Sequence, residues 1–170
     1  MRPYIERHLI VQRQSDDHYD VQQQDTPDRN PDQMQEHFQS MPPTMLESFQ
    51  RHMIWHHLHP SFHHYDEDHL LIDFFYAEAV YASLYYGYCQ PGTFADRRRR
   101  ARAWETETMN LAPDTVIVLV KATADVICQR LRDNLRPTPL SNRHVEQVLQ
   151  RYDEEYNNSL IYRRISLDTS

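Results

Sequence analysis

Glycine is scarce in this chain. The 170 residues include two glycines, Gly87 and Gly92, where an average usage of about 7% would supply roughly a dozen. The shortage excludes architectures that need glycine at many positions: a Rossmann dinucleotide fingerprint, a glycine-rich kinase loop, repeated tight hairpins and collagen-like repeats. The length suits one domain and is too short for two ordinary ones.

Positive charge, and lysine in particular, is also in short supply. The formal net charge is −7 at pH 7, and Lys121 is the single lysine beside 17 arginines. A chain with this balance lacks the broad basic field that recruits DNA or RNA. The use of arginine in place of lysine favours planar, bidentate contacts with anions.

Cysteine and long apolar runs are the remaining shortages. Cys89 and Cys128 lack CxxC spacing and are too few for a disulfide framework, so we expect two reduced packing thiols. No apolar stretch approaches the roughly 18 residues of a membrane span. The beginning, MRPYIERHLIVQ, lacks the apolar run of a signal peptide. These absences favour a cytoplasmic protein that contacts neither nucleic acid nor membrane.

The chain divides into a polar N-terminal arm, 1–44, and an α/β domain, 45–170. Gln, Asp, His and Pro dominate residues 13–44, which favours a loop, a short helix or an arm. Within the arm, Tyr4–Gln12 carries the apolar residues of one possible strand. Further strands are expected over 69–73, 115–120 and 162–168. Helices are expected between Pro43 and Pro60 and over 75–86, 94–111, 123–134 and 141–156.

From residue 69 onward the expected order is strand, helix, helix, strand, helix, helix, strand. This order favours right-handed crossovers over a parallel sheet, and therefore an α/β fold. The run Thr115–Val120 (TVIVLV) has no alternation with polar residues, which predicts a strand that is buried on both faces.

Three segments carry a resemblance to a known family. LLIDFFYAEAVYASLYYG is a strand that ends in an acid and leads into a helix with a Val-Tyr pair. APDTVIVLVKATADVICQRLRDN follows, and HVEQVLQRYDEEYNNSL with RRISLDTS comes last. In this order, over about residues 43–168, they resemble the P-loop nucleoside and nucleotide kinases of the thymidylate-kinase-like and deoxynucleoside-kinase-like type. The resemblance implies a three-layer sheet flanked by helices, a nucleotide or other small anion as ligand, and ATP with Mg²⁺ as cofactors if the chain is a kinase.

The phosphate-binding loop of that family is missing. Phosphoryl transfer needs backbone N–H groups and a Lys around the phosphates, with the signature GxxxxGK[ST] between a strand and a helix. Gly87–Gly92 has the glycine spacing, but Thr93 replaces the Lys and Pro91 removes an N–H donor. The segment also follows a helix, and residues 1–86 contain no glycine. We therefore expect no phosphoryl transfer from this chain.

The resemblance also implies a set of site residues. Asp73 stands where the family has an acid that accepts a proton or orients Mg²⁺ through water, although Phe74 replaces the Arg that follows it there. From the residues alone, Asp73 is equally a helix N-cap. The substrate side maps to Glu78, Tyr81 and Arg97, the last of these within the arginine run 97–100. The phosphate-clamping lid maps to Arg130, Arg132 and Arg136.

A missing first strand raises a structural problem. In these kinases that strand lies mid-sheet, between the strands expected here at 69–73 and 115–120. An empty position would leave buried backbone groups unpaired, at about 1–3 kcal/mol each. Tyr4–Gln12 is the internal candidate to replace it. Otherwise another chain adds a strand, which favours a homo-oligomer or a larger assembly, or the chain is part of a longer product.

Histidines gather between residues 52 and 69. His52 and His56 have the i,i+4 spacing of two metal ligands on one helix face, but no HExxH motif is present. The cluster is either a metal site or an imidazole-rich surface, and we assign it no metal ligand. Three functions stay open: a degenerate, non-catalytic kinase-like protein that binds a nucleotide or anion or serves in an assembly, a nucleoside monophosphate kinase whose phosphate loop is absent from this chain, and a His-rich metal-binding or interaction module.

Overall fold

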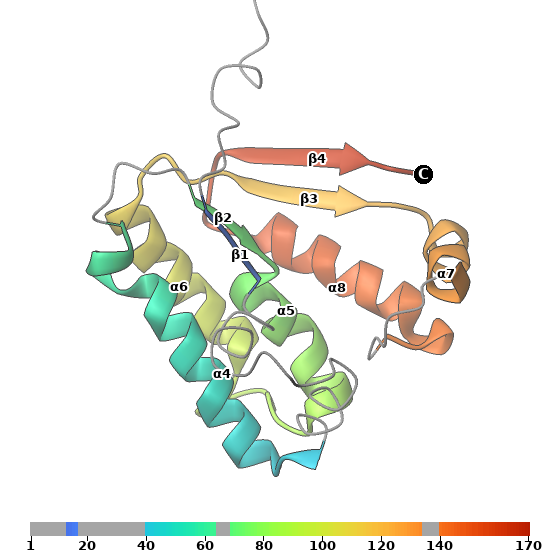
Figure 1. Ribbon diagram of the computed structural model, residues 1–170, viewed down its shortest axis with the longest axis horizontal. Coiled ribbons are helices and arrows are strands. Elements are labelled where there is room, and N and C mark those ends of the chain that lie inside the picture. Colours follow the sequence, from blue (N-terminus) through green and yellow to red (C-terminus); the bar gives the residue numbers. More distant parts are fainter. Residues whose placement is uncertain (1–12, 17–39, 64–68, 134–139) are drawn as a thin grey trace, which may run out of the picture.

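A computed structural model describes residues 13–16, 40–63, 69–133 and 140–170, which form a mixed α/β fold (Figure 1). The strands are β1 (Arg13–Asp16), β2 (His69–Ile72), β3 (Ile117–Lys121) and β4 (Arg164–Asp168). The α-helices are α4 (Pro43–Leu58), α5 (Phe74–Tyr81), α6 (Arg97–Leu111), α7 (Ala124–Asp133) and α8 (Val145–Asn158). Two 3-10 turns, η1 (Pro60–His63) and η3 (Asn142–His144), and one π-helical turn, η2 (Ala82–Tyr86), complete the set.

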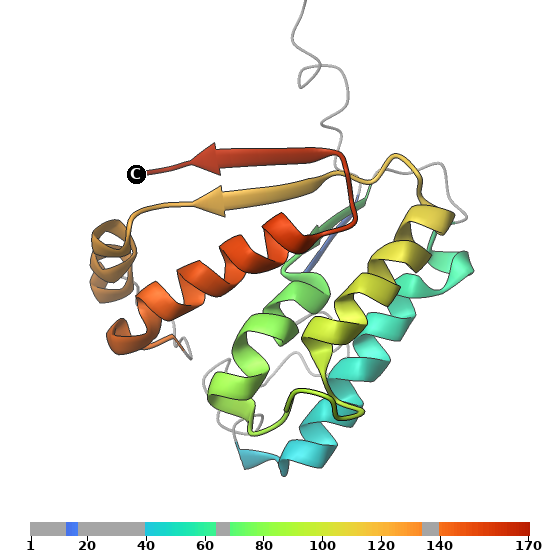
Figure 2. The ribbon, with the colours of Figure 1, turned by 180° about the vertical axis from the view of Figure 1, so that it is seen from behind.

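The strand pairs described are both parallel, which confirms the expected strand direction. β1 pairs with β2 from Arg13 opposite His69 to Asp16 opposite Ile72. β3 pairs with β4 from Ile117 opposite Arg164 to Lys121 opposite Asp168. The two pairs form separate two-stranded sheets. Helices α4, α5, α6 and α8 lie to one side of them in both views (Figures 1 and 2).

The N-terminal strand differs from the expectation. Residues 13–16 (RQSD), expected to be loop or arm, form β1, while Tyr4–Gln12 lies outside the described residues. The β1 sequence, RQSD, shows no alternation of apolar and polar residues. The feature that identifies it as a strand is its backbone pairing with β2. A polar strand of this kind cannot be predicted from periodicity.

The expected burial of the 115–120 strand on both faces is wrong. Val118 and Val120 of β3 are 44% and 61% exposed, and Ile165 and Leu167, which pair with them on β4, are 44% and 48% exposed. Paired residues of a parallel sheet point to the same face. Because α8 packs against β3, Ile117 and Leu119 are half-buried on the opposite side. No described element covers the face formed by Val118, Val120, Ile165 and Leu167, which we call the apolar sheet face.

The core lies among the helices. Its main cluster joins α4, α5 and α6 through Ile54, Leu58, Phe74, Phe75, Ala101 and Trp104. A second cluster holds Leu46, Ala82, Tyr88 and Cys89 where η2 and the following loop meet α4. Cys89 and Cys128 are free thiols, as expected, and burial raises the pKa of the Cys89 thiol.

Several local signals are confirmed. Gly87 ends the π-helical turn at φ +72°, and a Cβ there would lie 3.0 Å from Pro43 Cγ, so only glycine fits without a shift. The Thr93 N–H bonds Gln90 O at 3.2 Å and closes the expected turn. At the start of α7, Thr123 Oγ1 accepts the Val126 N–H at 3.4 Å, which is an N-cap contact.

Candidate functional site

The structure separates the residues that the family resemblance brings together. Asp73 and Tyr81 lie where α5 faces α8, while Glu78 and Arg97 lie inside the helical core. Arg130 and Arg132 lie on α7, and Arg136 lies outside the described residues. The described members of this set therefore lie in three separate places, and each group is described in turn.

Asp73 follows β2 on a strained backbone. Its φ is 62° and the φ of Phe74 is 40°, values that non-glycine residues rarely adopt. Asp73 makes no side-chain cap on α5. Instead the Tyr152 hydroxyl lies 3.5 Å from Asp73 Oδ1, and the Tyr81 and Tyr152 rings meet edge to face at 6.0 Å. Burial and the Asp73 charge raise the pKa of Tyr81 to about 12 and that of Tyr152 well above its ordinary value. Both phenols therefore stay protonated beside the carboxylate.

Arg97 forms a buried ion network with two glutamates. Its side chain is fully buried, with Nη2 2.9 Å from Glu47 Oε1 and Nε 3.8 Å from Glu78 Oε2. Nη2 also donates to the Glu47 carbonyl oxygen at 3.1 Å, and the Tyr88 hydroxyl donates to Glu78. The guanidinium lies over the Tyr88 ring at 5.5 Å and over the Trp104 ring at 5.6 Å from the ring centroids. Glu78 and Arg97 thus bind each other inside the core.

Two other arginines of α6, Arg98 and Arg102, form ion pairs with α8. Arg98 binds Glu154 at 2.6 Å and Glu155 at 2.7 Å, and Arg102 binds Glu155 at 2.8 Å. These contacts raise the pKa of Arg98, and the Arg98 bond lowers the pKa of Glu154. Arg98 and Arg102 are therefore used for helix packing.

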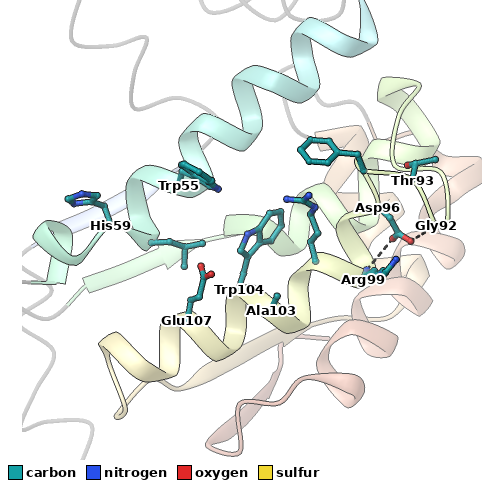
Figure 3. Close-up of a pocket in the computed structure, with 12 residues that line it drawn as sticks. Trp55, His59, Gly92, Thr93, Asp96, Arg99, Ala103, Trp104 and Glu107 are labelled. Carbon is teal, nitrogen blue, oxygen red and sulfur yellow. Dashed lines mark hydrogen bonds between the residues drawn. The ribbon is translucent and has the colours of Figure 1, made fainter.

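Arg99 and Arg100 differ from their neighbours because they line a pocket. The pocket lies between α4, α6 and the Gly92 turn and has a volume of about 670 Å³ (Figure 3). We call it the α4–α6 pocket. Its aromatic lining consists of Trp55, Phe94 and Trp104, and its acids are Asp96 and Glu107. Arg99 and Arg100 make no ion pair within the described part of the chain.

The rim of the pocket is fixed by Asp96. Its Oδ1 accepts the Arg99 N–H at 3.1 Å, which caps α6, and its Oδ2 accepts the Gly92 N–H at 2.7 Å. The Arg100 guanidinium lies 4.1 Å from the centroid of the exposed Phe94 ring. Trp104 is 4% exposed and forms the floor, while Trp55 is 65% exposed at the side. The two arginines thus lie at a helix N-terminus, where the backbone adds positive potential.

Two of the expected lid arginines, Arg130 and Arg132, make hydrogen bonds within the chain. Arg130 Nη2 donates to Thr169 O at 2.6 Å and Nη1 to Thr169 Oγ1 at 3.0 Å. Arg132 Nη2 donates to Gln129 Oε1 at 2.6 Å. Neither Arg130 nor Arg132 lines the α4–α6 pocket. Their role in a lid stays a prediction.

The Gly87–Gly92 segment does not fit the phosphates of ATP. Gly87 ends a helix, Pro91 has no N–H, and the N–H groups of Gly92 and Thr93 are already bonded to Asp96 and Gln90. A phosphate cradle needs these donors free. No step of a phosphoryl transfer can therefore be assigned to this segment.

The histidines make local contacts. His57 Nδ1 donates to Met53 O at 3.2 Å, and His63 Nε2 donates to His57 O at 2.8 Å. Over 40–63, 69–133 and 140–170, no three His, Cys, Asp or Glu side chains are grouped to hold a metal ion. In the same ranges, no helix has both the length and the apolar character that a bilayer span requires.

No family model, curated protein or solved structure matches this chain. The site must therefore be judged from its own residues. Sequence reasoning missed Trp55, Phe94 and Glu107, which come from different elements. One available signal was the i,i+4 spacing of Arg100 and Trp104, which places a cation and an indole on the same helix face.

Proposed function

We propose that this chain is a kinase-like α/β protein that binds a nucleotide-like anion in the α4–α6 pocket and transfers no phosphoryl group. The parallel strand pairs and the order of elements from β2 to β4 support a sheet of the P-loop-kinase type. The pairing of β1 with β2 supports β1 as the replacement for the missing first strand. A three-layer arrangement is part of this proposal.

The contrast among neighbouring arginines carries the proposal. Arg97, Arg98 and Arg102 each bind glutamates of the chain. Arg99 and Arg100 bind no carboxylate within the described residues, and both line the pocket. Cations in the first turn of a helix oppose its macrodipole. The Asp96 carboxylate that caps α6 supplies one negative charge against the two guanidinium groups. A phosphate between the two guanidinium groups would supply the remaining negative charge.

The pocket walls suit an aromatic ring attached to such an anion. Trp55, which is 65% exposed, offers a face on which a planar base can stack, with Phe94 and the edge of Trp104 as further apolar lining. At the other end of the pocket in Figure 3, the Glu107 carboxylate is a hydrogen-bond acceptor suited to the N–H groups of a bound base. A volume of about 670 Å³ lies within the range of small-molecule sites. A nucleoside monophosphate combines the required anion, ring and donors.

Tryptophan fluorescence tests the proposal directly, because both tryptophans of the chain line the pocket. Titration with thymidine monophosphate, with thymidine and with inorganic phosphate should give a saturable change that is strongest for the nucleotide. The double variant Arg99→Ala, Arg100→Ala should weaken nucleotide binding by about tenfold or more per arginine. Arg143→Ala, an exposed arginine outside the pocket, is the matched control and should bind normally.

Two outcomes would contradict the proposal. An equal response of the double variant and the control would remove the arginines from the site. ATP-dependent phosphorylation of a nucleoside monophosphate that Asp73→Asn abolishes would overturn the non-catalytic part and favour the kinase alternative with ATP and Mg²⁺.

A further inference from the structure

The outer edge of β4 carries unpaired backbone groups. The Ile117 N–H bonds Arg163 O at 3.0 Å, and the Thr169 N–H bonds Lys121 O at 2.8 Å, so residues 163 and 169 direct their backbone groups toward β3. Backbone direction alternates along a strand. Arg164, Ser166 and Asp168 therefore direct their N–H and C=O groups away from β3. No described strand pairs with this edge, which Figure 1 shows along the outer side of the β3–β4 pair.

We propose that a second copy of this chain pairs with this edge in antiparallel direction, about a two-fold axis at Ser166. In this register Ser166 lies opposite Ser166 of the partner subunit, and Arg164 lies opposite Asp168 of the partner subunit. Each opposed pair exchanges two backbone hydrogen bonds, as alternate pairs of an antiparallel ladder do. The outward-facing N–H and C=O groups of all three residues are then satisfied.

The charges of β4 complement each other in this register. Arg164 uses three of its five N–H groups on the carbonyl oxygens of Ile161, Asn157 and Ser159, the last two at the end of α8. It makes no ion pair within the described residues. Its two remaining N–H groups match the carboxylate of Asp168 of the partner subunit. Asp168 accepts bonds from the Ser170 backbone and side chain. A carboxylate has about four acceptor sites, so capacity remains for the arginine of the partner subunit.

The apolar residues match as well. Ile165 lies opposite Leu167 of the partner subunit on the other face of the strand, and such cross-strand apolar pairs stabilise antiparallel sheets. Val118 lies beside Ile165 and Val120 beside Leu167. The apolar sheet face thus continues across the axis into the second copy, and the facing sides of Ile165 and Leu167 become buried.

The pattern favours a second copy over an unrelated peptide. Read in reverse, Arg-Ile-Ser-Leu-Asp places opposite charges against each other at its ends, apolar residues against each other next to them, and Ser166 against itself at the centre. Edge strands that avoid association carry proline or charges that repel an added strand, and β4 has neither a proline nor charges of one sign. The contact is small, so the dimer is expected to be weak and concentration-dependent.

Sedimentation velocity from roughly 1 µM to roughly 1 mM should show a monomer–dimer equilibrium. Ser166→Pro removes an outward N–H without touching the ladder to β3, and it should weaken dimerisation by about tenfold or more. Ser166→Ala keeps the N–H and should dimerise like the original chain. Circular dichroism should show that both variants are folded.

A cysteine pair tests the register. Ser166→Cys places two thiols across the axis at a Cα separation of about 5.5 Å, within disulfide reach, so oxidation should link the dimer. Leu167→Cys is at a position that is also exposed, but its copies lie two residues apart along the ladder and should not link. A monomer throughout the concentration range, a dimer insensitive to Ser166→Pro, or equal linking of both cysteine variants would overturn the proposal.

Discussion

The helical region and the β3–β4 pair use charge and apolar surface in opposite ways. Around α6, an arginine is fully buried between two glutamates. Along β3, Val118 and Val120 are half-exposed although they belong to the most apolar run of the chain. The difference teaches that burial depends on what packs against an element as well as on its composition. Three predictions compare how the helical region and the β3–β4 pair contribute to stability.

The largest effect is expected from Arg97→Met. The substitution removes the buried cation beside Glu78 and leaves Glu47 with Arg51 as its remaining ion-pair partner. Breaking a buried pair in this way costs about 3–5 kcal/mol. Arg98→Met is the matched control on the next residue. Because Arg98 is 44% exposed, its loss should cost about 1 kcal/mol or less. Urea unfolding of both variants measures the difference, and equal costs would contradict a special role for Arg97.

Alkaline pH should weaken the helical region. Burial raises the pKa values of Tyr76, Tyr88 and Tyr152, and burial with the Asp73 charge raises that of Tyr81 to about 12. Above about pH 10 the unfolded chain releases phenolic protons that the folded chain retains. The free energy of unfolding should therefore be independent of these groups below pH 10 and fall above it, by up to about 1.4 kcal/mol per pH unit for each tyrosine.

Phenolate absorbance and urea unfolding measure this dependence together. Tyr81→Phe should reduce the slope of the unfolding free energy against pH, since one of the retained protons is removed. A slope that the variant leaves unchanged would show that Tyr81 titrates normally in the folded chain.

The smallest effect is expected on the apolar sheet face. Val120→Thr exchanges a methyl group for a hydroxyl at a position that is 61% exposed, so stability should change by about 0.5 kcal/mol or less. The same substitution at Val80, which is fully buried in α5, should cost about 1–3 kcal/mol. Thermal unfolding of the two variants compares the regions, and a large loss at Val120 would show that this face is covered.

Local patterns predicted the elements well, because their signals lie within the elements. Helix stripes such as Ala101, Trp104 and Thr108 are buried as their 3.6-residue spacing predicts. Gly87 and Thr123 end and begin helices where the sequence places them. β1 was not predicted, because it is a strand only through its pairing with β2, more than 50 residues later in the chain.

The candidate site was less predictable. The run Arg97 to Arg100 shows four equal charges in the sequence, yet helix geometry sends them in different directions. One enters the core, one binds α8, and two line the pocket. The ion pairs of these arginines depend on the positions of Glu47, Glu78 and Glu155, which come from three other helices. No spacing rule within the run contains that information.

The strand pairing also bears on how the chain folds. Arg13 pairs with His69 and Ile117 pairs with Arg164. The helices also join distant segments, since Arg97 of α6 donates to the Glu47 carbonyl of α4, 50 residues earlier. Contacts between distant segments form slowly, because a long loop must close first. The turns within each helix are therefore expected to form early, and both the helix packing and the strand pairs later. During synthesis, β3 emerges well before β4 and has no partner in the interval. Val118 and Val120 then belong to an unpaired apolar strand, which makes this the interval when the chain is most prone to aggregation.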